Sequence, residues 1–533
     1  MKKRIGTILV CILLIASSSV IVTPVESLKA SRNTVYVDDD NISGPWDGTQ
    51  EHPYQHIQDA VNNASDSDTI YVYSGIYNER IKINKTLFIF GLVYDTNIGN
   101  DFGKPIIDSN GTGPIFYVKA DSCIIDGFVT RHAGDKSQRW GGFDIYSKSC
   151  NISNNECRGY SYSGIYIESS AENIMIYNNT IKGVIIGISC WGKGTNISKN
   201  KISNSGWAIE STYDGDTMIY RNIICDNNRG IYSTYGGSRY IINNNISNNR
   251  YNGIQLRIPL KKNIIKGNII CNNYEGSGIY LLDFSNGIID NNTICANKNN
   301  GITIYKTADG TSKGNIILNN TIKSNQVFQI EIHGDTKKIS YNTINNNEFL
   351  GEVEIWWSDN NIISNNNFIN GGLDIIHSEG NNVTNNWINN KSLVYLEGIS
   401  FKEVKDAGQV ILVNCESIDI KNQNLSNIGV GIQLFNSKGC SIINNKITNN
   451  ELGLRFFGSN WNFISKNNFL NNDKNAIFYD CYINQWRRNY WDKPRFLPMP
   501  IFGYMGYFIP IPWFNFDWFP VKKPYDIPIP DVP

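Results

Sequence analysis

The chain has 533 residues, of which 48 are basic and 48 acidic, so its formal net charge is zero at neutral pH. This balance, without a basic stripe, argues against a nucleic-acid-binding protein. Isoleucine, tyrosine, asparagine and glycine recur through the middle of the chain, whereas the helix-favouring alanine and leucine are scarce there. Isoleucine and tyrosine favour strands, while asparagine and glycine favour tight turns, so the composition predicts many short strands separated by bends.

Residues 1–30 have the layout of a secretory signal peptide. A basic start, residues 2–4, precedes an apolar run, residues 5–15, and small residues follow as far as Ala30. We therefore expect a secreted or cell-surface protein, with an uncleaved N-terminal anchor as the alternative. No membrane span is expected after signal cleavage, because prolines and glycines interrupt the apolar segment 500–520.

Residues 31–120 are predicted to form an N-terminal cap and the first coils of a repetitive fold. The segment 56–61, His-Ile-Gln-Asp-Ala-Val, is short and amphipathic, which suits a helix that covers an open end. Strand-like runs at 68–72 and 81–86 follow it, with turns between them. This succession resembles the opening coils of pectin-lyase-like proteins.

A repeat of about 22 residues occupies residues 121–487. Its anchor is an apolar residue followed five positions later by a second one, with Asn-Asn or a variant between them, as in Ile176–Ile181 and Ile241–Ile246. This period predicts three short strands and three bends per coil, with each strand pairing in parallel with its copies above and below. The predicted fold class is all-β: a right-handed parallel β-helix with an N-terminal helical cap and an aromatic, proline-rich C-terminal cap.

Two segments depart from the repeat. The anchors are 37 residues apart around residues 389–416, which predicts an irregular coil or an insertion. Residues 488–533 are rich in aromatic residues and proline and are predicted to fold back over the last coil. Such a cap is expected because an open β-helix end exposes unpaired strand edges.

The repeats resemble those of the NosD-like branch of β-helix proteins, which carry carbohydrate-binding and sugar-hydrolase (CASH) repeats. The clearest match is the segment 406–415, Asp-Ala-Gly-Gln-Val-Ile-Leu-Val-Asn-Cys, which precedes further Asn-rich coils. The order of N-terminal segment, repeats and aromatic tail resembles that of secreted archaeal surface proteins. The resemblance implies metalloenzyme maturation as one candidate role, although five scattered histidines argue against a dedicated copper site.

Equivalent positions of successive coils stack, so the sequence also predicts which side chains share an outer face. A first outward row comprises Tyr166, Ser189, Glu210, Tyr232, Gln255, Tyr280, Thr303, Glu331, Glu354 and Asp374. A second row, two positions further along each strand, comprises Glu168, Trp191, Thr212, Thr234, Arg257, Leu282, Tyr305, His333 and Trp356. Aromatic side chains therefore line much of one long face.

Three consecutive coils bring acidic residues together on this face. The candidate catalytic residues are Glu331, Glu354, Asp374 and the supporting His333. The candidate sugar-binding residues are Trp191, Tyr280, Tyr305 and Trp356. Carboxylates one coil apart would be ~5 Å from each other and those two coils apart ~10 Å, which brackets the separations found in glycoside hydrolases. No cofactor is required, but the same carboxylates suit calcium as an alternative.

Three interpretations of this face stay open. It binds a polysaccharide or a cell-envelope glycan, it carries a polysaccharide lyase or glycoside hydrolase site, or it is a solvated polar face whose aromatic residues simply suit strands. The signatures of polygalacturonases and alginate epimerases are absent from the sequence, which makes catalysis the less favoured function. We predict glycan binding as the most specific function that the sequence supports.

The cysteines offer a separate prediction. Cys271 and Cys295 occupy the same position in adjacent coils, and Cys225 holds it two coils earlier. Such a stack forms either a disulfide or a ladder of reduced thiols, of which we favour the ladder. No Cys-x-x-Cys pair occurs, which argues against zinc.

Overall fold

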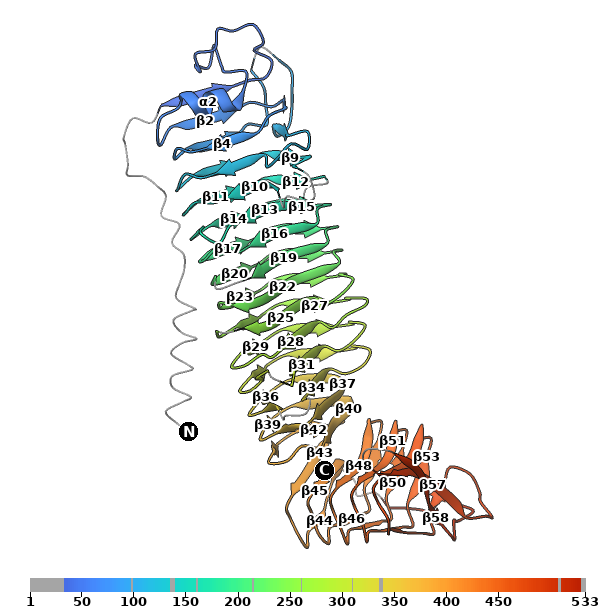
Figure 1. Ribbon diagram of the computed structural model, residues 1–533. Coiled ribbons are helices and arrows are strands. Elements are labelled where there is room, and N and C mark those ends of the chain that lie inside the picture. The colour runs from blue at the N-terminus through green and yellow to red at the C-terminus, as the bar shows by residue number, and fades with distance from the viewer. Residues whose placement is uncertain are drawn as a thin grey trace.

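The computed structural model describes residues 33–528, except for 97–98, 135–139, 160–161, 213–214, 260, 309, 335–338 and 507–509. The described chain is a right-handed parallel β-helix, which confirms the predicted fold class (Figure 1). Within these residues no helix is long and apolar enough to cross a membrane. The expected signal peptide, residues 1–30, lies outside the described residues.

Helix α2, Ile57–Asn63, closes the N-terminal end of the column (Figure 1). It buries Ile57, Ala60 and Val61 against the first coils. The carboxylate of Glu79 accepts hydrogen bonds from the backbone N–H groups of Ile57 and Gln58, at 2.8 and 2.9 Å. These are donors that a helix start leaves without intrahelical partners. The predicted helical cap is therefore confirmed.

One row of strands carries the predicted functional face, and we call it the central row. Its strands pair in parallel, and their inward isoleucines, such as Ile279, Ile302 and Ile330, are fully buried. The alternate side chains point outward, as the two-residue period of a strand requires. The central row comprises β22 (Arg229–Gly236), β25 (Ile254–Pro259), β28 (Ile279–Leu282), β31 (Ile302–Tyr305), β34 (Ile330–His333), β37 (Glu348–Trp356) and β40 (Asn367–Ile376).

Buried asparagines at the bends tie each coil to the next. Asn243 adopts a positive φ of 55°, whereas the following Asn244 is buried and forms the inter-coil bonds. The Nδ2 group of Asn244 donates to the Ile219 carbonyl at 2.9 Å and to Asn268 Oδ1 at 3.0 Å. Its own Oδ1 accepts the backbone N–H of Asn222 at 2.9 Å. The two members of an Asn-Asn pair thus have different roles, one in the turn and one in the ladder.

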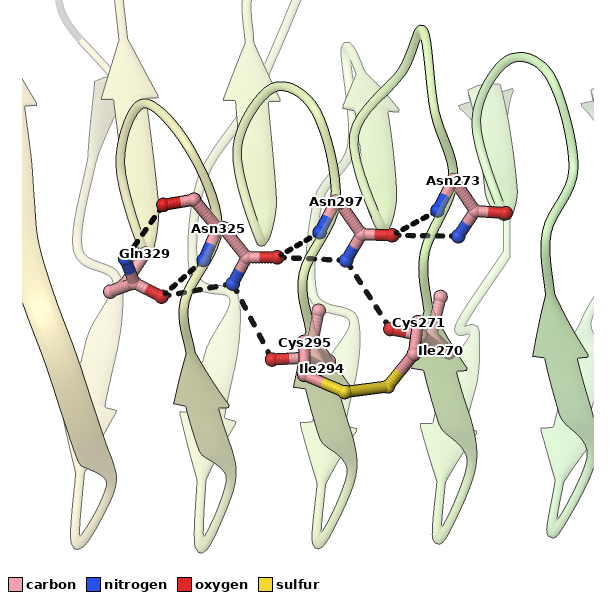
Figure 2. The surroundings of a disulfide bond; sticks show 8 residues. All are labelled: Ile270, Cys271, Asn273, Ile294, Cys295, Asn297, Asn325 and Gln329. Carbon is pink, nitrogen blue, oxygen red and sulfur yellow. Dashed lines mark hydrogen bonds between the residues drawn. A yellow bond between two sulfur atoms is a disulfide. The ribbon is translucent and has the colours of Figure 1, made fainter.

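A disulfide joins two adjacent coils beside a second asparagine ladder (Figure 2). Cys271 and Cys295 form this bond, with their Cα atoms 4.6 Å apart, so the reduced ladder that we favoured from the sequence is wrong at this position. Direct stacking in neighbouring strands, β27 (Ile269–Cys271) and β30 (Thr293–Cys295), brings the two sulfur atoms within bonding distance. Cys225 is free, because Ser247 lies between it and Cys271 in the stack.

The column bends after β40, within the segment predicted to be irregular. β42 (Trp387–Ile388) and β43 (Lys391–Glu397) pair antiparallel across Asn389 and Asn390, which both have positive φ as a tight hairpin requires. The chain therefore reverses before new coils form, and a second stack leaves the first at an angle (Figure 1). We call this junction the elbow. The strands that follow in parallel are β45 (Ala407–Val413), β48 (Val430–Phe435), β51 (Leu452–Phe457) and β54 (Lys474–Tyr479).

Two buried glutamines of the second stack complete the last strand of the central row. Oε1 of Gln409 accepts the Leu373 N–H at 3.0 Å, and its Nε2 donates to the Leu373 carbonyl at 2.9 Å. Gln433 contacts both backbone groups of Ile375 in the same way. A side-chain amide carries an acceptor oxygen and a donor NH₂ group, like the C=O and N–H of a backbone. Each glutamine therefore makes the hydrogen bonds that a neighbouring strand would make, and leaves this part of the edge of β40 paired.

A hairpin covers the last coil, as expected for a C-terminal cap. It consists of β57 (Met499–Met505) and β58 (Ile511–Asp517), which pair antiparallel. The buried carboxylate of Asp517 accepts the Asn489 N–H at 2.8 Å and the Trp491 indole N–H at 3.0 Å. Asp517 thereby accepts the hydrogen bonds of Asn489, the last asparagine in the ladder of the second stack.

Candidate functional site

The strand registers place the two predicted rows on the outer face of the column. Each residue of the first row, from Tyr166 to Asp374, is the partner of the next one in the adjacent strand. The second row is continuous from Thr212 to Trp356, and Trp191 directly follows β16 (Ile186–Cys190). The catalytic and sugar-binding roles assigned to these residues stay predictions.

An open groove of about 650 Å³ lies on this face, over β22 to β34. Tyr251 and Tyr280 line it together with arginine, glutamate and amide side chains. The guanidinium group of Arg229 lies 5.5 Å from the ring centre of Tyr232 and 5.6 Å from that of Tyr251. These two cation–π contacts fix the positions of the rings. Planar rings interspersed with hydrogen-bonding groups suit an extended sugar chain.

The structure brings three of the four predicted sugar-binding residues to one part of the face. Tyr280 lines the groove. Beyond the groove, the ring of Tyr305 stacks on His333 at 5.6 Å, and His333 contacts Trp356 at 4.9 Å. Trp191 packs against Tyr166 instead, towards the N-terminal end of the column. The face therefore has a continuous run of rings near the elbow, with Trp191 apart from it.

Glu331, Glu354 and Asp374 lie side by side on β34, β37 and β40. Glu331 accepts a hydrogen bond of 2.6 Å from Asn300 Nδ2, and its other oxygen is 4.0 Å from His333 Nδ1. Exposure falls along this series, because the side chain of Glu331 is 24% exposed and that of Asp374 only 4%. The acidic row therefore runs from solvent into a buried position at the elbow.

The burial of Asp374 is caused by Arg455, which reaches across the elbow from β51. Arg455 Nη1 donates to Asp374 Oδ2 in a largely buried ion pair. Another carboxyl group, that of Glu352 on β37, faces the same guanidinium and lies against Gly429 of the second stack. The repeat pattern of the sequence does not indicate Arg455 or Glu352 as site residues. The wide spacing at 389–416 marks the bend but does not say which residues meet there.

Burial and neighbouring charges shift two of these carboxyl groups. Burial, followed by the charges of Asp374 and Glu331, raises the pKa of Glu354 to about 7. Burial, followed by the charges of Asp374 and Glu451, raises the pKa of Glu352 to about 8. Near neutral pH, Glu354 is thus divided between its acid and its base form, and Glu352 is mostly protonated. Adjacent carboxyl groups with different protonation states are typical of acid–base sites.

A second cavity of about 360 Å³ lies at the elbow, and both stacks contribute to it. Trp356 and His377 line it from the first stack, and Arg455, Tyr479 and Tyr504 from the second stack and the C-terminal cap. We call this cavity the elbow pocket. It lies at the end of the aromatic run on the central row, so the predicted face leads into a site that only the bend creates.

Within the described part of the chain, the group of carboxylates close enough together to hold a calcium ion lies away from this face. Among the described residues, the three carboxylates that bring ligand atoms within 4.8 Å of one another are Asp38, Asp40 and Asp95. They belong to the N-terminal end of the column, whereas β34 to β40 lie next to the elbow (Figure 1). Calcium binding by Glu331, Glu354 and Asp374 stays a prediction.

Comparison with protein-family models matches residues 186–321 to "Right handed beta helix region". This match agrees with the fold and is coarser than the NosD-like branch that the sequence resembles. Comparison with curated proteins found no match.

Several solved β-helix structures are similar to this chain. The A-module of mannuronan C-5 epimerase AlgE6 from Azotobacter vinelandii is 13% identical, with a TM-score of 0.39, over 62% of this chain and 92% of that one. A complex of XylC with xylose is 13% identical, with a TM-score of 0.37, over 66% and 86% of the two chains. DFA-IIIase from Arthrobacter chlorophenolicus A6 is 13% identical, with a TM-score of 0.34, over 66% and 94%. At these identities and TM-scores the likeness assigns no property of those proteins to this chain.

Proposed function

We propose that the protein binds a polysaccharide or cell-envelope glycan along the outer face of the central row, as a secreted or cell-surface β-helix. Two adjacent features of this face carry the proposal: the groove over β22 to β34 and, beyond it, the rings of Tyr305, His333 and Trp356, which lead to the elbow. Sugar rings have apolar faces that stack on aromatic side chains and hydroxyl groups that need polar partners. This face offers both in one line.

Replacement of Tyr280 by alanine tests the proposal. We expect the affinity for a bound polysaccharide to fall about tenfold, because a lost ring contact of this kind costs about 1–1.5 kcal/mol. A glycan array with the purified protein identifies the ligand, and calorimetry with that ligand measures the change.

Tyr341→Ala is the matched control, since Tyr341 is 64% exposed and lies outside the groove and the elbow pocket. The proposal fails if the protein binds no glycan, or if both variants lose affinity equally.

A second candidate function, glycoside hydrolysis, is favoured by the raised pKa of Glu354 beside Glu331. Carboxyl groups on neighbouring strands are ~5 Å apart, which matches the retaining geometry. Glu354 would protonate the leaving oxygen, and the more exposed Glu331 would form the glycosyl ester that water then hydrolyses. Reducing-sugar release from the bound glycan is expected for the native protein and not for Glu354→Gln. Equal release by both would exclude this assignment.

A further inference from the structure

The outer face of the central row is open along its length but blocked at one end. Asp374, the last outward residue of the first row, is 3% exposed because Arg455 of the second stack covers it. Gly429 N–H also donates to the Gly371 carbonyl, so the second stack touches β40 directly. Figure 1 shows the second stack leaving the first beside β40. An extended ligand that follows the central row therefore meets a wall at the elbow.

The wall is aromatic on the side that faces the elbow pocket. Rings stack down the second stack, with Phe457 and Tyr479 4.7 Å apart and Tyr479 and Tyr504 5.8 Å apart. On the opposite side Trp356 closes the pocket. A cavity of about 360 Å³ is at the small end of the range for ligand pockets. A pocket of this size can hold one or a few terminal sugar rings, but it is too small for a longer stretch of the chain.

Two buried polar atoms at this place have no hydrogen-bond partner among the described residues. They are the indole N–H of Trp356, which lines the pocket, and Oδ1 of Asp374, whose other oxygen is bonded to Arg455. Buried polar groups are nearly always hydrogen-bonded, so an unpaired donor and an unpaired acceptor in one cluster are unusual. Of the two, only the Trp356 indole N–H belongs to a residue that lines the pocket, and a sugar hydroxyl can accept a hydrogen bond from it.

The charges around the pocket select against an acidic sugar. Arg455 is the cation that lines the pocket, and Asp374 already neutralises it. Asp480 is an acidic group in the pocket lining, and Glu354 is two positions before the lining residue Trp356 on β37. Asp480 and the ionised fraction of Glu354 would repel a uronate carboxylate, and Arg455, the one arginine or lysine among the described lining residues, is already paired with Asp374. An uncharged sugar meets no such repulsion.

We propose that the elbow pocket recognises the end of a neutral glycan chain whose body lies along the central row. This inference rests on the proposed function and adds the ligand class and the mode of recognition. An open β-helix groove binds the middle of a polymer, since a chain can pass out at either end. Here the elbow stops the chain, and the pocket holds its terminal sugar.

The experiment compares a neutral polysaccharide before and after partial depolymerisation at constant mass, using the neutral glycan that the array identifies. Depletion binding measures the protein bound at saturation. If the pocket reads chain ends, capacity rises in proportion to the number of ends. Capacity that follows mass alone overturns the inference while leaving glycan binding intact, whereas no binding to any glycan overturns the proposed function itself. Binding restricted to acidic glycans overturns the assigned ligand class.

Variants locate the effect in the pocket. Tyr479→Ala removes one aromatic wall, and we expect at least a tenfold loss of affinity for short neutral oligosaccharides of the same series. Tyr341→Ala serves as the control outside the face and should bind as the native protein does. Because Tyr479 also packs between two rings, circular dichroism and the urea midpoint of the variant establish that it is folded. A folded Tyr479→Ala protein with native affinity would rule out the pocket.

Discussion

Arg455→Leu is expected to destabilise the protein by about 3–5 kcal/mol, the cost of leaving a buried carboxylate without its partner. Asp374 is 3% exposed and the guanidinium of Arg455 is its ion-pair partner across the elbow. Its loss also leaves Glu352 and Glu354 facing Asp374 without an intervening positive charge. The midpoint of urea unfolding, followed by fluorescence of the tryptophans, measures the change.

Two further variants separate this effect from a general loss of charge. The double variant Asp374→Asn with Arg455→Leu should recover much of the lost stability, since no unpaired charge then remains buried. Arg250→Leu should change stability little, because Arg250 and its partner Glu275 are both about half exposed. A single variant Arg455→Leu as stable as the native protein would show that the elbow does not depend on this ion pair.

Glu352→Gln is expected to stabilise the protein at pH 8–9 and to flatten its pH dependence. The pKa of Glu352 is raised to about 8 in the folded state, above the 4.5 of an ordinary glutamate. A raised acid pKa contributes stability that is present below pH 4.5 and is lost as pH rises through 8. A shift of this size corresponds to roughly 3–5 kcal/mol between these limits, and the neutral amide does not lose it. Thermal midpoints between pH 4 and 9 measure the effect.

The control for this titration is Glu348→Gln on the same strand. Glu348 is exposed at the outer end of β37, so its replacement should leave the pH profile parallel to that of the native protein. Glu354→Gln should also stabilise the protein at pH 8–9, but by less than Glu352→Gln. The reason is that the pKa of Glu354, about 7, lies closer to that of an ordinary glutamate. A native protein whose stability rises between pH 6 and 9 would contradict the assignment.

The repeat made most of the fold predictable from sequence. Isoleucines at a fixed spacing have one low-energy arrangement, in which equivalent positions stack, and so the spacing alone identified the neighbours of Glu354 and Asp374. The helical cap was predictable from the apolar side of residues 57–61. These are local or periodic signals, and each one depends only on residues within one or two coils.

The bend and the residues that it joins were not predictable in this way. Arg455 and Asp374 are 81 positions apart, and a repeat pattern relates only residues separated by one period. The hairpin at Asn389 and Asn390 reverses the chain and so breaks the rule that links sequence spacing to position in space. The spacing of Cys271 and Cys295 predicts that they stack, but it does not decide whether they form a disulfide or stay reduced.

The asparagine ladder has a consequence for how this architecture changes over time. Asn222, Asn244 and Asn268 make the same bonds to the coils before and after them, so an inserted copy of one coil would find matching partners on both sides. Duplication of a coil ahead of β40 would lengthen the column by ~4.8 Å and leave the junction at Gln409 and Gln433 untouched. Column length and the geometry of the bend are therefore free to diverge separately among descendants of one ancestral gene.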